Sequence, residues 1–164
     1  DVAPSRGLGD VYKRQPVYNA TSVAALGVAA HECGHAIQHA KSYAPLSIRS
    51  ALVPIANFGS MLAWPVILIG LLFNTRSSGL IIDIGILLFS AAVLFQLVTL
   101  PVEFDASRRA LVMLRTQGIL ADDELRYTRR VLKSAALTYV ASAAAAILQL
   151  LRIILITNGR RRDD

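Results

Sequence analysis

The sequence has little charge and almost no cysteine, and each shortage excludes a class of protein. Of its 164 residues, 17% are charged and 54% are hydrophobic, and the mean hydropathy is +0.50. Soluble globular domains carry about 25% charged residues, so this chain has too few to cover a soluble surface. The single cysteine, Cys33, excludes a disulfide framework and a zinc cluster built from CxxC pairs within one chain. The composition therefore favours an integral membrane protein.

Positive charge is present, but its arrangement does not suit nucleic acid. The net charge is +6 and the isoelectric point is about 10.0. The Lys and Arg residues flank long apolar runs and do not form a stripe interleaved with aromatic residues. We therefore expect the lipid bilayer as a partner and no nucleic acid.

Three apolar stretches are long enough to cross a bilayer as helices, which takes about 20 residues. They cover residues 54–73, 79–100 and 135–157. Asp83 and Arg152 are the charged residues within them. The polar segment 74–78 joins the first two stretches, which predicts an antiparallel helical hairpin. The expected fold class is all-α, a polytopic membrane protein.

A further helix is expected before the hairpin. Thr21 or Ser22 can cap it, and it runs to about Lys41 with all three histidines of the chain. Pro45 and Pro54 follow, and they predict interruptions of helical structure between this helix and the first span.

The segment after the hairpin predicts two more helical elements. Pro101 is expected to open a helix that carries Glu103, and Gly118 is expected to end that helix as its C′ residue. Asp122 and Asp123 can cap the next helix, which leads into the third span.

The chemistry of the chain centres on His31-Glu32-Cys33-Gly34-His35, an HExxH motif on the predicted helix. Positions i and i+4 lie on one helix face, so both imidazoles can reach one tetrahedral Zn²⁺. Glu32 lies to the side of that face, where it can take a proton from water at the metal. Gly34 removes bulk between the ligands and lets another backbone or a substrate approach. The alternative is a pair of hydrogen-bonded core histidines, but such polar groups are costly to bury in an apolar helix.

A catalytic zinc needs a third protein ligand and one open position. His39 lies about 12 Å along the helix axis from His31, too far to share its ion, so it suits the helix surface or a substrate contact. Glu103 is the stronger candidate, because a two-helix hairpin returns the chain to the side it left. The alternative for Glu103 is a charge favoured at a helix N-terminus.

Four other residues are candidates for supporting roles. Asp105 either accepts a hydrogen bond from a ligand imidazole or pairs with Arg108 or Arg109. Tyr139, Arg108 and Arg109 are candidate donors to a developing oxyanion, and the sequence leaves the choice among them open. Each also has a structural interpretation, Tyr139 as an interfacial aromatic and the arginines as contacts to solvent or lipid headgroups.

Long segments of the chain resemble the neutral zinc metallopeptidases of bacterial membranes, the YugP-like group. The similar segments are residues 23–54, 97–110 and 136–151, and the resemblance extends from about Pro16 to the C-terminus. It implies a zinc-dependent endopeptidase with one catalytic ion that acts on a peptide or a membrane protein. It also implies roles for particular residues: His31 and His35 as ligands, Glu32 as catalytic base and Glu103 as third ligand.

A more distant similarity links the chain to gluzincins of the HtpX-like kind, in which a Glu beyond a membrane hairpin completes the site. Those proteins carry an Asp four residues after that Glu. Here the residue at that position is Ser107, and the nearest Asp is Asp105.

The resemblance also bears on the domain boundaries. Members of the family carry an N-terminal membrane helix and a short cytosolic segment before the region that this chain resembles. Residues 1–15 are polar, without the apolar core of a signal peptide and without periodicity. We therefore expect residues 1–15 to be a non-native leader on a truncated gene, with a membrane metallopeptidase domain at 16–157 and a polar tail at 158–164. Such shortening can leave the chain inactive.

Two alternative functions remain open. One is an intramembrane protease of the site-2 type, for which Asp83 is the available third ligand. The other is a membrane scaffold or metal-binding protein without turnover. Lys and Arg residues are more numerous on the side of the HExxH helix, which predicts a cytoplasmic active site in a bacterial cell membrane. The basic C-terminal tail argues against this orientation if the third segment spans fully.

Overall fold

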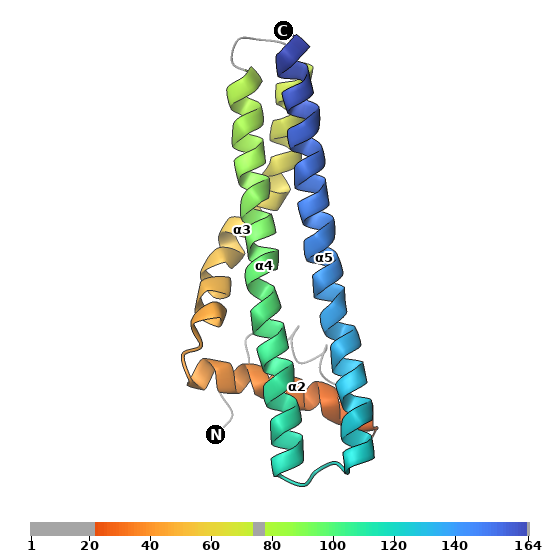
Figure 1. Ribbon diagram of the computed structural model, residues 1–164. Helices are drawn as coiled ribbons and strands as arrows, with labels where there is room; N and C mark the ends of the chain where they lie inside the picture. The colour runs from red at the N-terminus through yellow and green to blue at the C-terminus, as the bar shows by residue number, and fades with distance from the viewer. Residues whose placement is uncertain (1–21, 74–77, 164) are drawn as a thin grey trace. The chain divides into compact units, whose positions relative to one another are not determined.

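The structure, a computed structural model, describes residues 22–73 and 78–163. The secondary structure in these ranges consists of helices: α2 (Val23–Ala40), α3 (Ala44–Leu72), α4 (Ser78–Thr116) and α5 (Asp122–Asp163) (Figure 1). The expected all-α fold class is thereby confirmed. The expected leader at 1–15 and all of the expected turn except Ser78 lie outside the described residues.

The four helices contribute to two compact units. The first unit contains α2, the part of α4 from Glu103 onward and the part of α5 up to Ala136. The second contains α3, the part of α4 up to Val102 and the rest of α5. The histidine-bearing helix and the segment that begins at Glu103 therefore belong to the same unit.

Helices α3, α4 and α5 are each long and apolar enough to cross a membrane, in agreement with the expected polytopic helical fold. Many of their large apolar side chains are exposed, among them Phe58, Leu72, Leu87 and Leu155. An apolar surface of this extent is unfavourable in water, whereas lipid chains solvate it. The described residues thus have the surface of a membrane protein.

Small residues bring α3 and α4 close together in the second unit. A Cβ added at Gly59 would lie 2.7 Å from the carbonyl oxygen of Leu88, and one added at Gly70 would lie 2.6 Å from the Ile82 side chain. The later residue of α3 thus meets the earlier residue of α4, as in an antiparallel pair. The contacts confirm the expected hairpin and are typical of membrane helices that pack through small residues.

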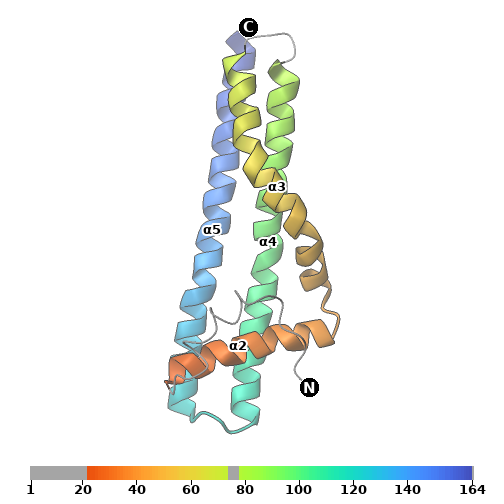
Figure 2. The ribbon, with the colours of Figure 1, turned by 180° about the vertical axis from the view of Figure 1, so that it is seen from behind.

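Proline does not interrupt the helices where the sequence predicted it would. Pro45 lies in the first turn of α3, where the missing N–H has no helical partner to lose. Pro54 and Pro65 lie inside α3, and Pro101 lies inside α4, so the expected breaks at Pro54 and Pro101 are wrong. A full break in lipid would leave several backbone groups unpaired, whereas a proline inside a continuing helix leaves few. Helix α3 changes direction along its length, as expected of a helix with internal proline (Figure 2).

Two predicted helix ends are confirmed. The Ser22 hydroxyl accepts a hydrogen bond from the backbone N–H of Ala25 and caps α2. Helix α4 ends in a Schellman motif: Gly118 has a φ of 61°, and the N–H of Ile119 donates to the carbonyl of Leu114.

The start of α5 differs from the prediction that Asp122 or Asp123 caps it. Asp122 is the first helical residue, and Ala121 holds the N-cap position, since its carbonyl accepts from the N–H four residues later. The backbone N–H of Ala121 donates to the Glu124 carboxylate at 2.9 Å, which is the second half of a capping box. The acidic first turn still opposes the positive end of the helix dipole.

Helix α2 lies across α4 and α5 in the first unit (Figures 1 and 2). The hydrophobic core at this crossing contains Ala30 of α2 together with Ala110, Leu114, Leu120 and Leu132. Glycines on α2 permit the close crossing: Gly34 meets the backbone of α4 at Ala106, and Gly27 meets the side chain of Thr128 on α5. This crossing brings the histidines of α2 against α4.

Candidate metal centre

Three potential metal ligands converge at the crossing of α2 and α4. His31 and His35 stand one turn apart on α2, and Glu103 projects from α4. The Nε2 atoms of the two histidines are 3.1 Å apart. The Glu103 Oε2 atom lies 3.2 Å from the Nε2 of His31 and 3.8 Å from the Nε2 of His35. The histidines are partly exposed, whereas Glu103 is buried.

The spacing of these atoms fits a zinc ion. Ligand atoms about 2.1 Å from zinc at tetrahedral angles lie about 3.4 Å from one another. The three distances of 3.1, 3.2 and 3.8 Å surround this value. Two imidazole nitrogens and one carboxylate oxygen form a His₂Glu set, which leaves the fourth tetrahedral position open for water or substrate. The donor set and its geometry therefore suit a catalytic zinc site.

Gly34 makes this convergence possible. It lies between the two histidines in sequence and is buried against the carbonyl of Ala106, three residues after Glu103. A Cβ at this position would lie inside van der Waals contact of that oxygen. The expectation that Gly34 admits another backbone is thus confirmed, and the backbone belongs to the helix that carries the third ligand.

Hydrogen bonds within the group shift the pKa values of its members. Burial raises the pKa of Glu103, but hydrogen bonds from His31 and His35 outweigh this and bring it to about 2. The hydrogen bond to Glu103 raises the pKa of His35, against the lowering effect of burial. Glu103 is therefore a carboxylate at neutral pH, as a ligand must be, while a metal ion would compete with a proton for His35.

The second nitrogen of each histidine also has a partner. The Nδ1 of His31 lies 3.1 Å from the hydroxyl oxygen of Ser107 on α4. The Nδ1 of His35 lies 2.9 Å from Gln38 Oε1, and the amide nitrogen of Gln38 donates to Asp105 at 3.0 Å. Partners at this nitrogen orient an imidazole and fix its tautomer.

Asp105 combines features of its two sequence interpretations. It forms ion pairs with Arg109 and, at 3.2 Å, with Arg108, as one interpretation expected. Its link to the candidate metal ligands is indirect: Asp105 accepts a hydrogen bond from Gln38, and Gln38 Oε1 lies against His35. The described contacts include no direct bond between Asp105 and an imidazole.

The sequence interpretation missed roles for Ser107 and Gln38. The signal for Ser107 was its position four residues after Glu103, where HtpX-like proteins carry an Asp. The signal for Gln38 was its spacing of three residues from His35, which places both side chains on one face of α2. Neither signal is specific until the crossing partner of α2 is known.

The remaining candidates lie outside the group of three. Glu32 follows His31 directly and is exposed. His39 is exposed on α2 and is not a member of the group. Arg108 is largely exposed and pairs with Asp105. Tyr139 is partly buried on α5, in the second unit.

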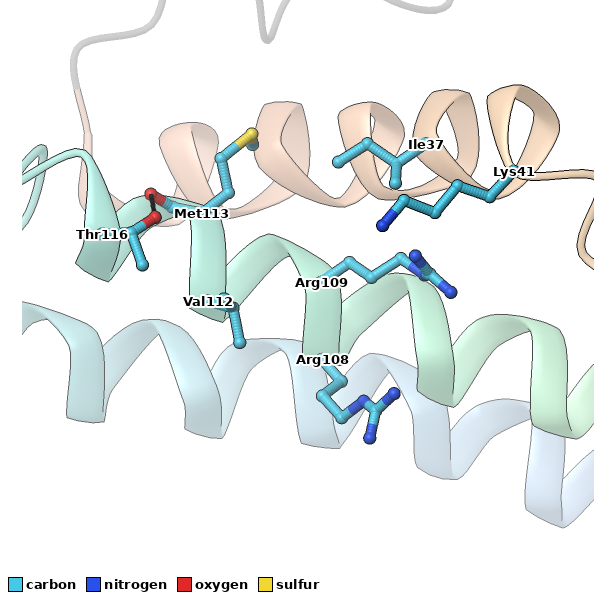
Figure 3. A pocket seen from close by; sticks show the side chains of 7 residues that line it. All are labelled: Ile37, Lys41, Arg108, Arg109, Val112, Met113 and Thr116. Atoms are coloured by element: carbon cyan, nitrogen blue, oxygen red, sulfur yellow. Dashed lines mark hydrogen bonds between the residues drawn. The ribbon is translucent and has the colours of Figure 1, made fainter.

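A cleft of about 420 Å³ lies between α2 and α4 in the same unit (Figure 3). Apolar and cationic side chains line it: Ile37, Lys41, Arg108, Arg109, Val112, Met113 and Thr116. Two of its three cations are the arginines that pair with Asp105. The ligand atoms do not line the cleft, so it is separate from the metal group.

The fold and the site together define a class of protein, a helical membrane protein with an HExxH helix and a candidate metal-binding group of two histidines and one glutamate. The chain belongs to the family described as "Putative neutral zinc metallopeptidase", whose model matches residues 11–158. This finding confirms the resemblance inferred from the sequence.

A curated relative agrees with this assignment. The chain is 46% identical over 147 residues to "Putative membrane protease YugP" of Bacillus subtilis (strain 168), a match that covers 89% of this chain. It spans 64% of the length of that relative. No solved structure matches the chain. The relative is named as a membrane protein, and three helices here can span a bilayer, so the chain is a membrane protein.

Proposed function

We propose that this chain is a zinc-dependent endopeptidase of the bacterial cell membrane that hydrolyses peptide bonds in peptide or membrane-protein substrates. The observation that carries the proposal is the set of distances among the His31, His35 and Glu103 ligand atoms, which suit tetrahedral zinc. Membership of a family described as zinc metallopeptidases supports the same chemistry.

Each residue of the site has a defined task in such a reaction. A zinc ion bound here would polarise the scissile carbonyl and lower the pKa of the attacking water. His31, His35 and Glu103 would hold the ion, and three protein ligands would leave one tetrahedral position open. Glu32, exposed beside His31, takes the proton from the water as it attacks and then delivers it to the leaving amine.

Replacement of Glu32 tests the catalytic part of the proposal. Glu32→Gln keeps the size of the side chain but removes its basicity. We expect the purified variant in detergent to retain zinc and to lose hydrolysis of an unfolded protein substrate such as casein. A general base contributes about 10²- to 10⁴-fold to rate, so the loss should be at least of this order. A variant with unchanged hydrolysis would refute the role of Glu32. Wild-type protein that binds zinc without hydrolysis of any substrate would favour the scaffold alternative.

A matched pair of histidine variants tests the metal site. His35→Ala removes a member of the group, and His39→Ala removes an exposed histidine from the same helix. We expect zinc content to fall with His35→Ala and with Glu103→Ala and to stay complete with His39→Ala. A full zinc complement in Glu103→Ala would remove the third ligand from the proposal.

The same comparison bears on the intramembrane alternative. In that alternative Asp83 is the third ligand, and zinc would be lost from Asp83→Asn and kept in Glu103→Ala. Among the described residues, the group near His31 and His35 contains Glu103 and not Asp83. This arrangement favours the gluzincin type of site.

We further propose that the site faces the cytoplasm. The single cysteine, Cys33, is exposed on α2 within the HExxH motif and reports the side on which this helix lies. A membrane-impermeant maleimide should label it only after the cells are permeabilised. A Cys33→Ser, Gly159→Cys variant is the control, because three spans place residue 159 on the opposite side. Labelling of Cys33 in intact cells would reverse the orientation.

A further inference from the structure

Gln38 stands out among the residues around the metal group because it is both polar and fully buried. Its relative exposure is 0%, although its side chain carries an amide. Burial of an amide costs free energy unless its donors and acceptor are satisfied. Both ends are in use here: Oε1 faces His35, and the amide nitrogen faces Asp105.

The charge of Asp105 determines which end of the amide faces which neighbour. An ionised carboxylate only accepts hydrogen bonds, and two arginines hold Asp105 in this state. The opposite amide orientation would set the Gln38 carbonyl against the carboxylate, acceptor against acceptor. Gln38 therefore presents its NH₂ group to Asp105 and its carbonyl oxygen to His35.

This orientation has a consequence for His35. Because Gln38 presents an acceptor, the Nδ1 of His35 must carry the proton when the ring is neutral. Its Nε2 then keeps a lone pair, and Nε2 is the atom that lies near His31 and Glu103. Ser107 cannot impose the same choice on His31, because a hydroxyl both donates and accepts.

We propose that Gln38, oriented by Asp105 and Arg109, is a positioning residue that holds His35 in the tautomer whose Nε2 binds the metal. The proposal rests on the metal site of the proposed function. It assigns no contact with substrate to Gln38. The effect depends on the donor-to-acceptor direction of the hydrogen bonds that link Arg109, Asp105, Gln38 and His35. This direction, here called the polarity, can be altered without removal of any metal ligand.

Three variants of the full chain separate this role from simple packing. Gln38→Met keeps the length of the side chain and removes both hydrogen bonds. Gln38→Glu keeps an acceptor for His35 but sets a carboxylate against Asp105. The double variant Gln38→Glu, Asp105→Asn restores the polarity, because the Asn amide can donate to the new carboxylate while that carboxylate accepts from His35.

The measurements are zinc affinity, by competition with a chromophoric chelator, and the His35 tautomer, by ¹⁵N NMR of metal-free protein in detergent. The NMR sample is held at a pH at which the histidines are neutral, and the His35 signals are assigned by their loss in His35→Gln. We expect a protonated Nδ1 in wild type. Loss of such an indirect partner lowers metal affinity by about 10- to 100-fold, so Gln38→Met and Gln38→Glu should weaken zinc binding by this amount. The double variant should regain about 10-fold or more over Gln38→Glu.

Two results would overturn the proposal. One is a wild-type His35 with the proton on Nε2, which would show that Gln38 does not set the tautomer. The other is a folded Gln38→Met variant with wild-type zinc affinity. If Gln38→Met fails to fold, the wild-type tautomer and the double variant still decide. Failure of the wild-type protein to bind zinc would contradict the proposed function. The tautomer is measured without metal, so it would still test whether Gln38 orients His35.

Discussion

Gly34→Ala tests the link between helix packing and the metal site. On a helix exposed to solvent, this change would stabilise the helix by about 1 kcal/mol through propensity. At Gly34 the new methyl group instead meets the carbonyl oxygen of Ala106, which is backbone and cannot rotate away. Helices α2 and α4 would have to separate by about 1 Å to restore ordinary contact. Overpacking of this kind costs about 1–3 kcal/mol, so we expect a net loss of stability despite the gain in propensity.

The separation should also reach the ligands. The bonds between His31, His35 and Glu103 cross the same interface, with present distances of 3.2 and 3.8 Å. An increase of about 1 Å would take the 3.2 Å distance past the 3.4 Å or so that tetrahedral zinc requires, and would move the 3.8 Å distance further from that value. We expect zinc affinity to fall about 10-fold or more, measured by chelator competition, together with a lower melting temperature by circular dichroism.

Gly159→Ala is the control for Gly34→Ala. Gly159 is also helical, but a Cβ there has no described neighbour within 4 Å, so propensity alone should act and zinc affinity should be unchanged. A Gly34→Ala protein with wild-type zinc affinity and a raised melting temperature would refute the packing argument.

Two further predictions concern stability. His35 has a raised pKa in the metal-free protein, so its contribution to stability is fully present below pH 6.5 and is lost as the pH rises through the raised value. As the pH rises through that value, the melting temperature of the metal-free protein should fall. Zinc affinity should rise over the same pH range, because zinc binds the neutral imidazole. A melting temperature of the metal-free protein that rises over this range, and still rises after the pH profile of His35→Gln is subtracted, would contradict the prediction. Thr128 is fully buried, and its hydroxyl has no hydrogen-bond partner among the described residues. Thr128→Val should therefore stabilise the protein by about 1–2 kcal/mol, seen as a higher melting temperature, whereas destabilisation would indicate a partner for the hydroxyl.

The convergence of the three candidate ligands was predictable because each step follows from a short-range rule. The spacing of His31 and His35 places them on one helix face whatever the rest of the fold is. Glu103 required one more step, the return of a helical hairpin to its starting side, and the structure brings it to the histidines. Patterns within one helix and one topological rule were enough to name the three residues that the structure brings together.

The supporting residues follow from a different kind of information. Gln38 contacts Asp105, 67 positions away, and His31 contacts Ser107, 76 positions away. Such pairs depend on the exact crossing of α2 over α4, which Gly34 and Ala106 set by close contact. A sequence pattern indicates that these helices have small residues, but not which residues meet.

Proline was the least reliable guide, and the reason is physical. The rules that end a helix at proline describe chains in water, where solvent pairs with the freed backbone groups. In an apolar segment no such partner exists, so continuation of the helix costs less than a break. Pro54 is the first residue of one expected span and Pro101 directly follows another, so both lie at the border of an apolar stretch, where this second rule still applies. The prediction of helix ends from Gly118 and Ser22 succeeded because both residues lie many positions away from the apolar stretches expected to span the membrane.

The continuity of α4 matters for the chemistry as well as for the fold. Because the helix runs from Ser78 to Thr116 through Pro101, Glu103 lies within a helix and not in a loop that follows the apolar segment. A loop between them would let the carboxylate adopt many positions, and ordering a loop costs about 1–2 kcal/mol per residue in backbone entropy. In a continuous helix this backbone entropy is already lost when the helix forms. The position of Glu103 along the helix then sets the face on which its side chain lies. Buried on the same helix three residues later, Ala106 receives Gly34, so one element presents both the third ligand and the surface that positions the first two.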